Sequence, residues 1–165
     1  WLSEAESRFA DTELSSLPPG RWLSFAPAVA LASKAWPVAN YISLANALSD
    51  IFTGVILDGS PQEREITEAV AKGLKIPYVN LAGKTSLLQA AAILTRAHLF
   101  VGSDSGLGHV ASAVGTPTLT LFSNDTPVRV LPWGKRSAYL CSDGANAGSI
   151  RVEDVLKMVR TLVVP

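Results

Sequence analysis

The chain has few of the residues that cross-link small domains or bind metals. Cys141 is the only cysteine among 165 residues, which excludes an internal disulfide and a cysteine-cluster metal site. Two histidines without cysteine partners argue against structural zinc. No single sign of charge dominates either, because 14 Lys and Arg balance 14 Asp and Glu. We therefore expect no metal, no cofactor and no nucleic-acid partner.

Long apolar runs and several catalytic signatures are also missing. No stretch approaches the ~20 apolar residues that span a bilayer, and no signal-peptide pattern opens the chain. The sequences G-x-G-x-x-G, HExxH and G-x-S-x-G do not occur, and Gly83-Lys84-Thr85 lacks the earlier glycine of a P-loop. These absences predict a cytoplasmic protein without a membrane span.

Methionine is scarce, and this bears on domain organisation. Met158 is the only methionine and the chain begins at Trp1, so we expect a segment of a longer protein. Residues 1–20 are polar and end in Pro18-Pro19-Gly20, which indicates a helix and linker arriving from a missing preceding domain. Residues 21–165 are expected to form one domain with a substantial core.

The chain does contain a regular alternation of short apolar strands and helical patterns. Strands are expected at 22–28, 55–57, 78–81, 99–102, 118–122 and 138–141. Helical spacing follows at 38–48, 66–73, 87–94, after residue 105 and at 152–159. This order predicts an α/β fold: a Rossmann-like three-layer domain whose parallel sheet has helices on both faces.

The turn after the fourth expected strand is the most informative segment. Asp104-Ser105-Gly106 leads into a helix N-terminus, where free backbone N–H groups gather and the helix dipole favours negative charge. Because Gly106 and Gly108 lack a Cβ, an anionic ligand could approach the backbone. An ordinary helix cap explains the same residues about equally well. His109 lies one turn after Ser105, where it could face that ligand or have a purely structural role.

Other polar loops should meet this turn, because the carboxyl ends of parallel strands lie at one edge of the sheet. Lys34 precedes Trp36-Pro37, and its ammonium is either solvated or neutralises phosphate oxygens. Glu63 completes a capping box with Ser60, and its carboxylate could also accept hydrogen bonds from a ribose. The two roles of Glu63 are compatible.

Taken in order, these segments resemble the C-terminal half of the ADP-heptose:lipopolysaccharide heptosyltransferases, glycosyltransferase family nine. That family carries K-x-W-P, G-x-P-x-E, N-L-A-G-K-T-S-L, D-S/T-G-x-x-H and a Gly/Ala-Pro segment. The chain matches them with Lys34-Ala35-Trp36-Pro37, Gly59-Ser60-Pro61-Gln62-Glu63, residues 80–87, Asp104-Ser105-Gly106-Leu107-Gly108-His109 and Gly115-Thr116-Pro117. It departs from the family at Ala28, at Ala35 and in the loop that begins at Ser123.

The resemblance implies a GT-B architecture of two Rossmann-like domains, of which this chain supplies the donor-binding one. It implies two catalytic residues, Lys34 at the leaving diphosphate and Asp104 at the donor sugar. Glu63 would bind the ribose, and the loop Gly83-Lys84-Thr85 would lie against the base. The implied phosphate contacts and their support come from the next turn: Ser105, Gly106, Leu107 and His109.

The implied reaction transfers heptose from ADP-heptose to a hydroxyl of the lipopolysaccharide inner core, with inversion. The general base and the acceptor site would belong to the missing N-terminal domain, so the isolated segment is expected to be inactive. The resemblance also implies a position at the periphery of the inner membrane. Two alternatives stay open: a non-catalytic nucleotide-sugar-binding module, and another GT-B enzyme, such as an epimerase, that uses a different nucleotide sugar.

Overall fold

Six parallel strands form the centre of the structure, a computed structural model that describes residues 2–27, 32–123 and 131–163. The strands are β1 (Trp22–Ala26), β2 (Gly54–Leu57), β3 (Tyr78–Asn80), β4 (Leu99–Ser103), β5 (Thr118–Phe122) and β6 (Ser137–Cys141). Their order across the sheet is β3-β2-β1-β4-β5-β6, and every neighbouring pair is parallel. The chain therefore starts in the middle of the sheet, builds outward to β3, and then crosses to the other half.

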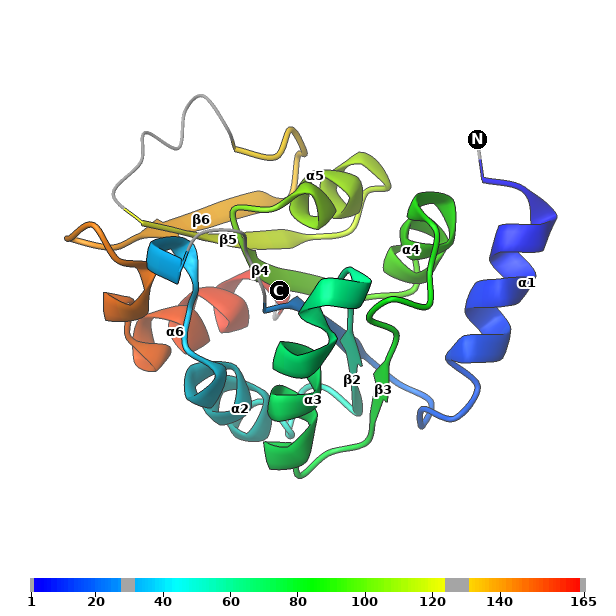
Figure 1. The fold of residues 1–165 in the computed structure, drawn as a ribbon, viewed down its shortest axis with the longest axis horizontal. Coiled ribbons are helices and arrows are strands. Elements are labelled where there is room, and N and C mark those ends of the chain that lie inside the picture. The colour runs from blue at the N-terminus through cyan, green and yellow to red at the C-terminus, as the bar shows by residue number, and fades with distance from the viewer. Residues whose placement is uncertain (1, 28–31, 124–130, 164–165) are drawn as a thin grey trace.

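Helices cover both faces of the sheet, as the alternating pattern predicts (Figure 1). One layer holds α2 (Val38–Ala47), α3 (Arg64–Gly73) and α6 (Val152–Val163), and the other holds α1 (Glu4–Glu13), α4 (Leu87–Leu94) and α5 (Gly106–Ala113). Short 3-10 helices are η1 (Ala32–Lys34), η2 (Pro61–Glu63) and η4 (Ala147–Ser149). This confirms the predicted three-layer, Rossmann-like α/β fold. No helix in the described part of the chain is both long and apolar enough to cross a bilayer.

Side-chain alternation along the strands divides the core between the two layers. Phe25 of β1 packs in the core beneath α2 and α6, whereas its neighbour Ala26 packs with Phe100 on the α4 and α5 side. On the α2 side, Tyr41 meets Phe25 and Trp36 edge-on, at ring-centroid distances of 5.1 and 4.9 Å. The buried Trp36 indole also donates a hydrogen bond to the Ile150 carbonyl at 2.8 Å. This anchor fixes the loop that carries Lys34.

The first strand is shorter than the sequence pattern suggests. It ends at Ala26 rather than continuing to residue 28, and Pro27 follows at once. Proline has no backbone N–H to donate to the neighbouring strand, which explains why the ladder stops there. Ala28 and residues 124–126, where the sequence departs from the family pattern, lie outside the described residues.

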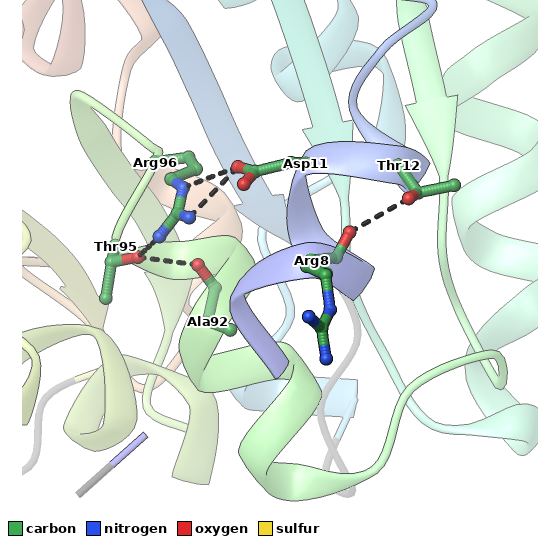
Figure 2. A network of polar contacts seen from close by, with 6 residues as sticks. All are labelled: Arg8, Asp11, Thr12, Ala92, Thr95 and Arg96. Carbon is green, nitrogen blue, oxygen red and sulfur yellow. Dashed lines mark hydrogen bonds and ion pairs between the residues drawn. The ribbon is translucent and has the colours of Figure 1, made fainter. Parts of the chain in front are cut away.

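Helix α1 packs against α4 and is part of the same folded unit. Its residue Ala10 and its C-cap Leu14 are buried with Ile93 of α4. At the end of α4, the Arg96 guanidinium holds the Asp11 carboxylate through Nε at 3.0 Å and Nη2 at 2.9 Å (Figure 2). A core contact and an ion pair therefore join residues 4–13 to this domain. That residues 1–20 lead in from a preceding domain stays a prediction.

Candidate ligand site at the carboxyl ends of the strands

A pocket of about 320 Å³ opens where the predicted polar loops converge at the carboxyl ends of the strands. It is lined by Ala26, Gly59, Ser60, Glu63, Thr85, Ser86, Leu87, Ala90, Ser105, Gly106 and Leu107. The walls thus come from β1, the β2–η2 loop with the end of η2, the β3–α4 loop, the first turn of α4 and the start of α5. A larger groove of about 870 Å³ runs between α2 and α6, but none of the sequence-predicted site residues lines it.

The start of α5 supplies backbone donors to this pocket. Ser105 is the N-cap in an extended conformation, yet its side chain makes no capping hydrogen bond. Its Oγ atom is buried without a hydrogen-bond partner among the described residues. A Cβ added at Gly106 would meet no heavy atom within 4 Å, so space is open beside the first helical residue. Among the described residues, the helix therefore begins without a side-chain cap and with a buried hydroxyl that has no partner, beside a pocket that Ser105 and Gly106 line.

Lys34 and Asp104 form an ion pair beside this turn. The Lys34 Nζ atom lies 3.0 Å from Asp104 Oδ2, and the two side chains are 27% and 19% exposed. The residues are 70 positions apart, and the parallel sheet brings together the loops that carry them. Asp104 immediately precedes Ser105, so the pair places one positive and one negative charge, both partly buried, next to the start of α5.

Glu63 has the structural role that its capping box predicts, and it also lines the pocket. Its Oε2 atom accepts a hydrogen bond from the Ser60 N–H at 2.6 Å. A carboxylate can accept further hydrogen bonds, so this contact does not exhaust the group. The structure therefore keeps both readings of Glu63 compatible.

The Gly83 turn joins two of the pocket walls. Gly83 has φ +74°, a conformation that favours glycine, and its N–H donates to the Gly59 carbonyl at 2.9 Å. A Cβ at this position would lie 2.9 Å from the Pro61 Cα atom. Only glycine lets the two loops approach this closely, which places Thr85 in the pocket wall.

Five sequence-predicted residues do not line the pocket: Lys34, Gly83, Lys84, Asp104 and His109. Lys84 follows the Gly83 turn but lines a separate, smaller pocket with Arg64 and Lys72. His109 is exposed on α5, one turn after Ser105, and does not line the main pocket. Apart from Lys84 and His109, the predicted residues come together at one rim: Glu63, Gly83, Thr85, Ser105, Gly106 and Leu107 around the pocket and its loops, with Lys34 and Asp104 beside them. Within the described residues, no group of three or more His, Cys, Asp or Glu could hold a metal ion.

Asp58 is a buried residue that the sequence analysis did not select. It follows β2, is 1% exposed, and accepts a hydrogen bond from Ser24 Oγ at 3.2 Å on Oδ2. Its Oδ1 atom has no partner among the described residues. Burial raises the pKa of the Asp58 carboxyl to about 7, although the Ser24 hydrogen bond lowers it. The sequence does contain a signal for Asp58, because a carboxylate that directly follows the apolar run 55–57 is expected at the carboxyl end of a buried strand.

The chain is similar to characterised heptosyltransferases in sequence. It is 31% identical over 134 residues to the lipopolysaccharide core heptosyltransferase OpsX of Haemophilus influenzae. That match covers 80% of this chain but only 38% of the relative, so the chain spans about two fifths of that protein's length.

Solved structures agree in fold. The chain matches Escherichia coli ADP-heptose lipopolysaccharide heptosyltransferase II with a TM-score of 0.85 and 27% identity, covering 99% of this chain and 53% of that one. It matches E. coli heptosyltransferase WaaC, solved with ADP, with a TM-score of 0.79 and 26% identity over 93% of this chain and 48% of that one. The model of glycosyltransferase family 9 (heptosyltransferase) matches residues 2–159, nearly the whole chain, so the chain belongs to this family.

Proposed function

We propose that the chain is the donor-binding half of an inverting glycosyltransferase that moves heptose from ADP-heptose to a hydroxyl of the lipopolysaccharide inner core. One observation carries the proposal. The N-terminus of α5, which no side chain caps within the described part of the chain, stands beside the Lys34–Asp104 ion pair and shares a pocket with Glu63. Fixed amide dipoles and a nearby cation are the groups that a diphosphate requires.

The chemistry of the leaving group explains this arrangement. When the sugar departs, negative charge grows on the diphosphate, and donors already in place stabilise it without reorganising. In this proposal, Lys34 and the amides of Ser105, Gly106 and Leu107 provide that stabilisation. Asp104, which holds Lys34 at 3.0 Å, would approach the donor sugar. His109 would support the turn from its place on α5.

The nucleoside would occupy the opposite part of the pocket. Glu63 would accept hydrogen bonds from the ribose hydroxyls while it keeps its contact with the Ser60 N–H. The loop Gly83-Lys84-Thr85 would lie against the base, with Thr85 in the pocket wall. The solved complex of the relative WaaC with ADP supports an adenine nucleotide as the ligand.

The remaining parts of the reaction belong, in this proposal, to a preceding domain that residues 1–20 join to this one. That domain would supply the general base and the acceptor site, and the whole enzyme would act in the cytoplasm at the periphery of the inner membrane. A chain that spans about two fifths of OpsX leaves room for such a domain in the longer protein.

Isothermal titration of the chain with ADP, UDP and their sugar conjugates tests the donor half of the proposal. We expect saturable binding of ADP and ADP-heptose and weaker binding of UDP. The donor half of the proposal is refuted if ADP shows no saturable binding at roughly millimolar concentration, which corresponds to a binding free energy of about 4 kcal/mol.

A second experiment tests catalysis. The longer protein, with its preceding domain, should transfer heptose from ADP-heptose to a core acceptor and give a product of inverted anomeric configuration by NMR. If ADP binds but no sugar is transferred, the chain is a non-catalytic nucleotide-sugar-binding module. Transfer or epimerisation of a different sugar would assign it to another GT-B enzyme.

A further inference from the structure

A second polar pocket lies on the edge of the sheet, outside the proposed donor site. It has a volume of about 260 Å³ and lies between α3 and β3, the outermost strand. Its lining residues are Arg64, Glu68, Ala71, Lys72, Tyr78, Asn80 and Lys84. Lys84 lines this pocket and Thr85 lines the donor pocket, so one loop separates the two.

The charge of this pocket is positive. Arg64 Nε contacts Glu68 Oε1 at 2.9 Å, which balances one of the three cations. In the described part of the chain, neither Lys72 nor Lys84 has an acidic partner within ion-pair distance. The pocket therefore presents two lysine charges that no carboxylate neutralises.

Local structure stabilises the charge of one of these two lysines but not that of the other. Lys72 lies in the last turn of α3, where the helix dipole stabilises a cation. Lys84 lies two residues before Ser86, the N-cap of α4, and its side chain is exposed. An anion bound between Lys72 and Lys84 would pair with both lysine charges.

The other lining residues suit a sugar. Tyr78 is 45% exposed on the edge strand, and an exposed aromatic ring provides an amphipathic surface against which the C–H face of a sugar can pack. Asn80 Oδ1 accepts the Ala82 N–H at 3.2 Å, which leaves the Asn80 side-chain Nδ2 group as a donor for a hydroxyl.

We propose that this edge-strand pocket binds a sugar phosphate, with Lys72, Lys84 and Arg64 around the phosphate and Tyr78 against the sugar ring. The pocket, with a volume of about 260 Å³, is somewhat smaller than the proposed donor pocket of about 320 Å³. The site shares no lining residue with the donor pocket, although Lys84 belongs to the loop proposed to lie against the base. Lys72 has no role in the proposed donor site, so it is the residue that distinguishes the two sites.

NMR titration of the 165-residue chain with glucose 6-phosphate tests the site, with glucose and inorganic phosphate titrated in parallel. We expect saturable amide shifts centred on Tyr78, Asn80 and Lys84 with glucose 6-phosphate. Inorganic phosphate should bind the same residues more weakly, and glucose alone should shift little. Lack of saturation with glucose 6-phosphate, or shifts centred on Ser105 instead, would overturn the proposal.

Variants assign the binding to this pocket. Each of Lys72→Gln and Lys84→Gln should weaken glucose 6-phosphate binding about fivefold, the effect of one charge at about 4 Å in water. Tyr78→Ala should abolish the preference for glucose 6-phosphate over inorganic phosphate. The matched control is Lys75→Gln, an exposed lysine three residues from Lys72 and outside the pocket, which should change nothing.

The two sites are distinguished by ADP. Lys72→Gln should leave ADP affinity unchanged while it weakens glucose 6-phosphate binding, and excess ADP should not displace the sugar phosphate. If Lys72→Gln and Lys75→Gln weaken glucose 6-phosphate binding equally, the protein attracts the anion through its general charge, and the proposed site is wrong. Displacement by ADP would show that the sugar phosphate occupies the donor pocket instead.

Discussion

Two helices begin at the same rim of the sheet, and their first residues differ in how they satisfy the backbone. At the start of α4, Ser86 Oγ accepts the Gln89 N–H at 3.3 Å and Gln89 Oε1 accepts the Ser86 N–H at 2.8 Å. At the start of α5, Ser105 makes no capping hydrogen bond, and its hydroxyl is buried without a partner among the described residues. One helix start is closed by its own residues, and the other is open.

In the proposed function, this difference favours the start of α5 over that of α4 as the place where an anion binds. Buried polar groups are nearly always hydrogen-bonded in native proteins, so an exception calls for an unseen partner. The closed start of α4 has used its side-chain acceptors internally, although Ser86 and Leu87 also line the pocket. The start of α5 lies beside the Lys34 ammonium, which Asp104 pairs at 3.0 Å, so an anion bound there would share Lys34 with Asp104 while it meets the positive end of the helix dipole.

The loop after β2 contains one polar group that is hydrogen-bonded within its own turn and one buried oxygen that is not hydrogen-bonded. Glu63 closes its turn through the Ser60 N–H, as in α4. Asp58 at the end of the same strand keeps a buried, unpaired Oδ1 atom, as Ser105 keeps its hydroxyl. Variants at the starts of α4 and α5 and in the loop after β2 can therefore be compared for ligand affinity and for stability. The comparison distinguishes a polar group that binds a ligand from one that only lowers stability.

The largest expected effect is on stability, at Asp58. Its native pKa of about 7 lies above the unfolded value of about 3.9, so the folded protein binds the extra proton. The contribution of the protonated Asp58 to the free energy of unfolding is fully present below about pH 4 and is lost as the pH rises through 7. This lowers the free energy of unfolding by up to about 4 kcal/mol. Urea unfolding at pH 4 to 8 should show this decline in the wild-type chain.

Asp58→Asn isolates the contribution of this one group. Asparagine keeps the shape and stays neutral, so the free energy of unfolding of the variant should decline less between pH 4 and 8. If the wild-type and Asp58→Asn curves run parallel, Asp58 is ionised in the folded protein and the assignment of a neutral buried carboxyl is wrong.

The next largest effect is on ligand binding, at Lys34. Lys34→Ala should weaken ADP binding by about 1.5–3 kcal/mol, the range for a hydrogen bond to a charged group. The calorimetric measurement belongs at low salt, because added ions screen charged contacts. Lys75→Ala is a suitable control for net charge. If the ADP affinity of Lys34→Ala is unchanged, Lys34 does not contribute to ADP binding, even if the start of α5 does.

The double variant with Asp104→Asn sharpens this test. In Lys34→Ala, the half-buried Asp104 carboxylate loses its partner and would repel a phosphate. If this repulsion contributes, Lys34→Ala with Asp104→Asn should bind ADP more tightly than Lys34→Ala alone. Equal affinities in the two variants would assign the whole loss to the missing ammonium.

The sequence predicts the elements of this site better than it predicts their contacts. Helix and strand periods indicate all six strands and the helices between them, since apolar spacing is a local property. The Ser60–Glu63 capping box is confirmed for the same reason: its two residues are three positions apart. Parallel strand order then brings the polar loops to one rim.

Long-range contacts could not be predicted in this way. The ion pair of Lys34 with Asp104 joins residues 70 positions apart, and no local pattern encodes that distance. Ser105 fits an N-cap by residue type, yet whether its hydroxyl caps the helix depends on a rotamer that the neighbouring loops decide. Lys84 illustrates the same limit, because the Gly83 turn directs adjacent residues of one loop to different pockets.

A smaller effect separates the two N-cap serines directly. Ser86→Ala should lower the free energy of unfolding by about 1 kcal/mol, since it removes a working cap. Ser105→Ala should change stability by less than about 0.5 kcal/mol, because it removes a hydroxyl that caps nothing. ADP affinity should fall more in Ser105→Ala than in Ser86→Ala. The reverse order in either measurement would contradict the comparison.

The smallest expected effect is a gain in stability at Gly106. Its φ is not in the left-handed region and a Cβ would meet open space, so Gly106→Ala should stabilise the fold by about 0.4–1 kcal/mol. Gly115 has the same open space but φ +86°, so Gly115→Ala should be destabilising and serves as the matched control. Thermal unfolding measures both changes.

The same substitution has the opposite effect on binding if the open helix end is the phosphate site. The new methyl group would occupy the space through which an anion reaches the first amides of α5, so Gly106→Ala should bind ADP more weakly while it melts at a higher temperature. A variant that gains stability and keeps its ADP affinity would show that the ligand approaches elsewhere. The unpaired Ser105 hydroxyl would then mark only a defect in capping, and the two helix starts would differ in stability alone.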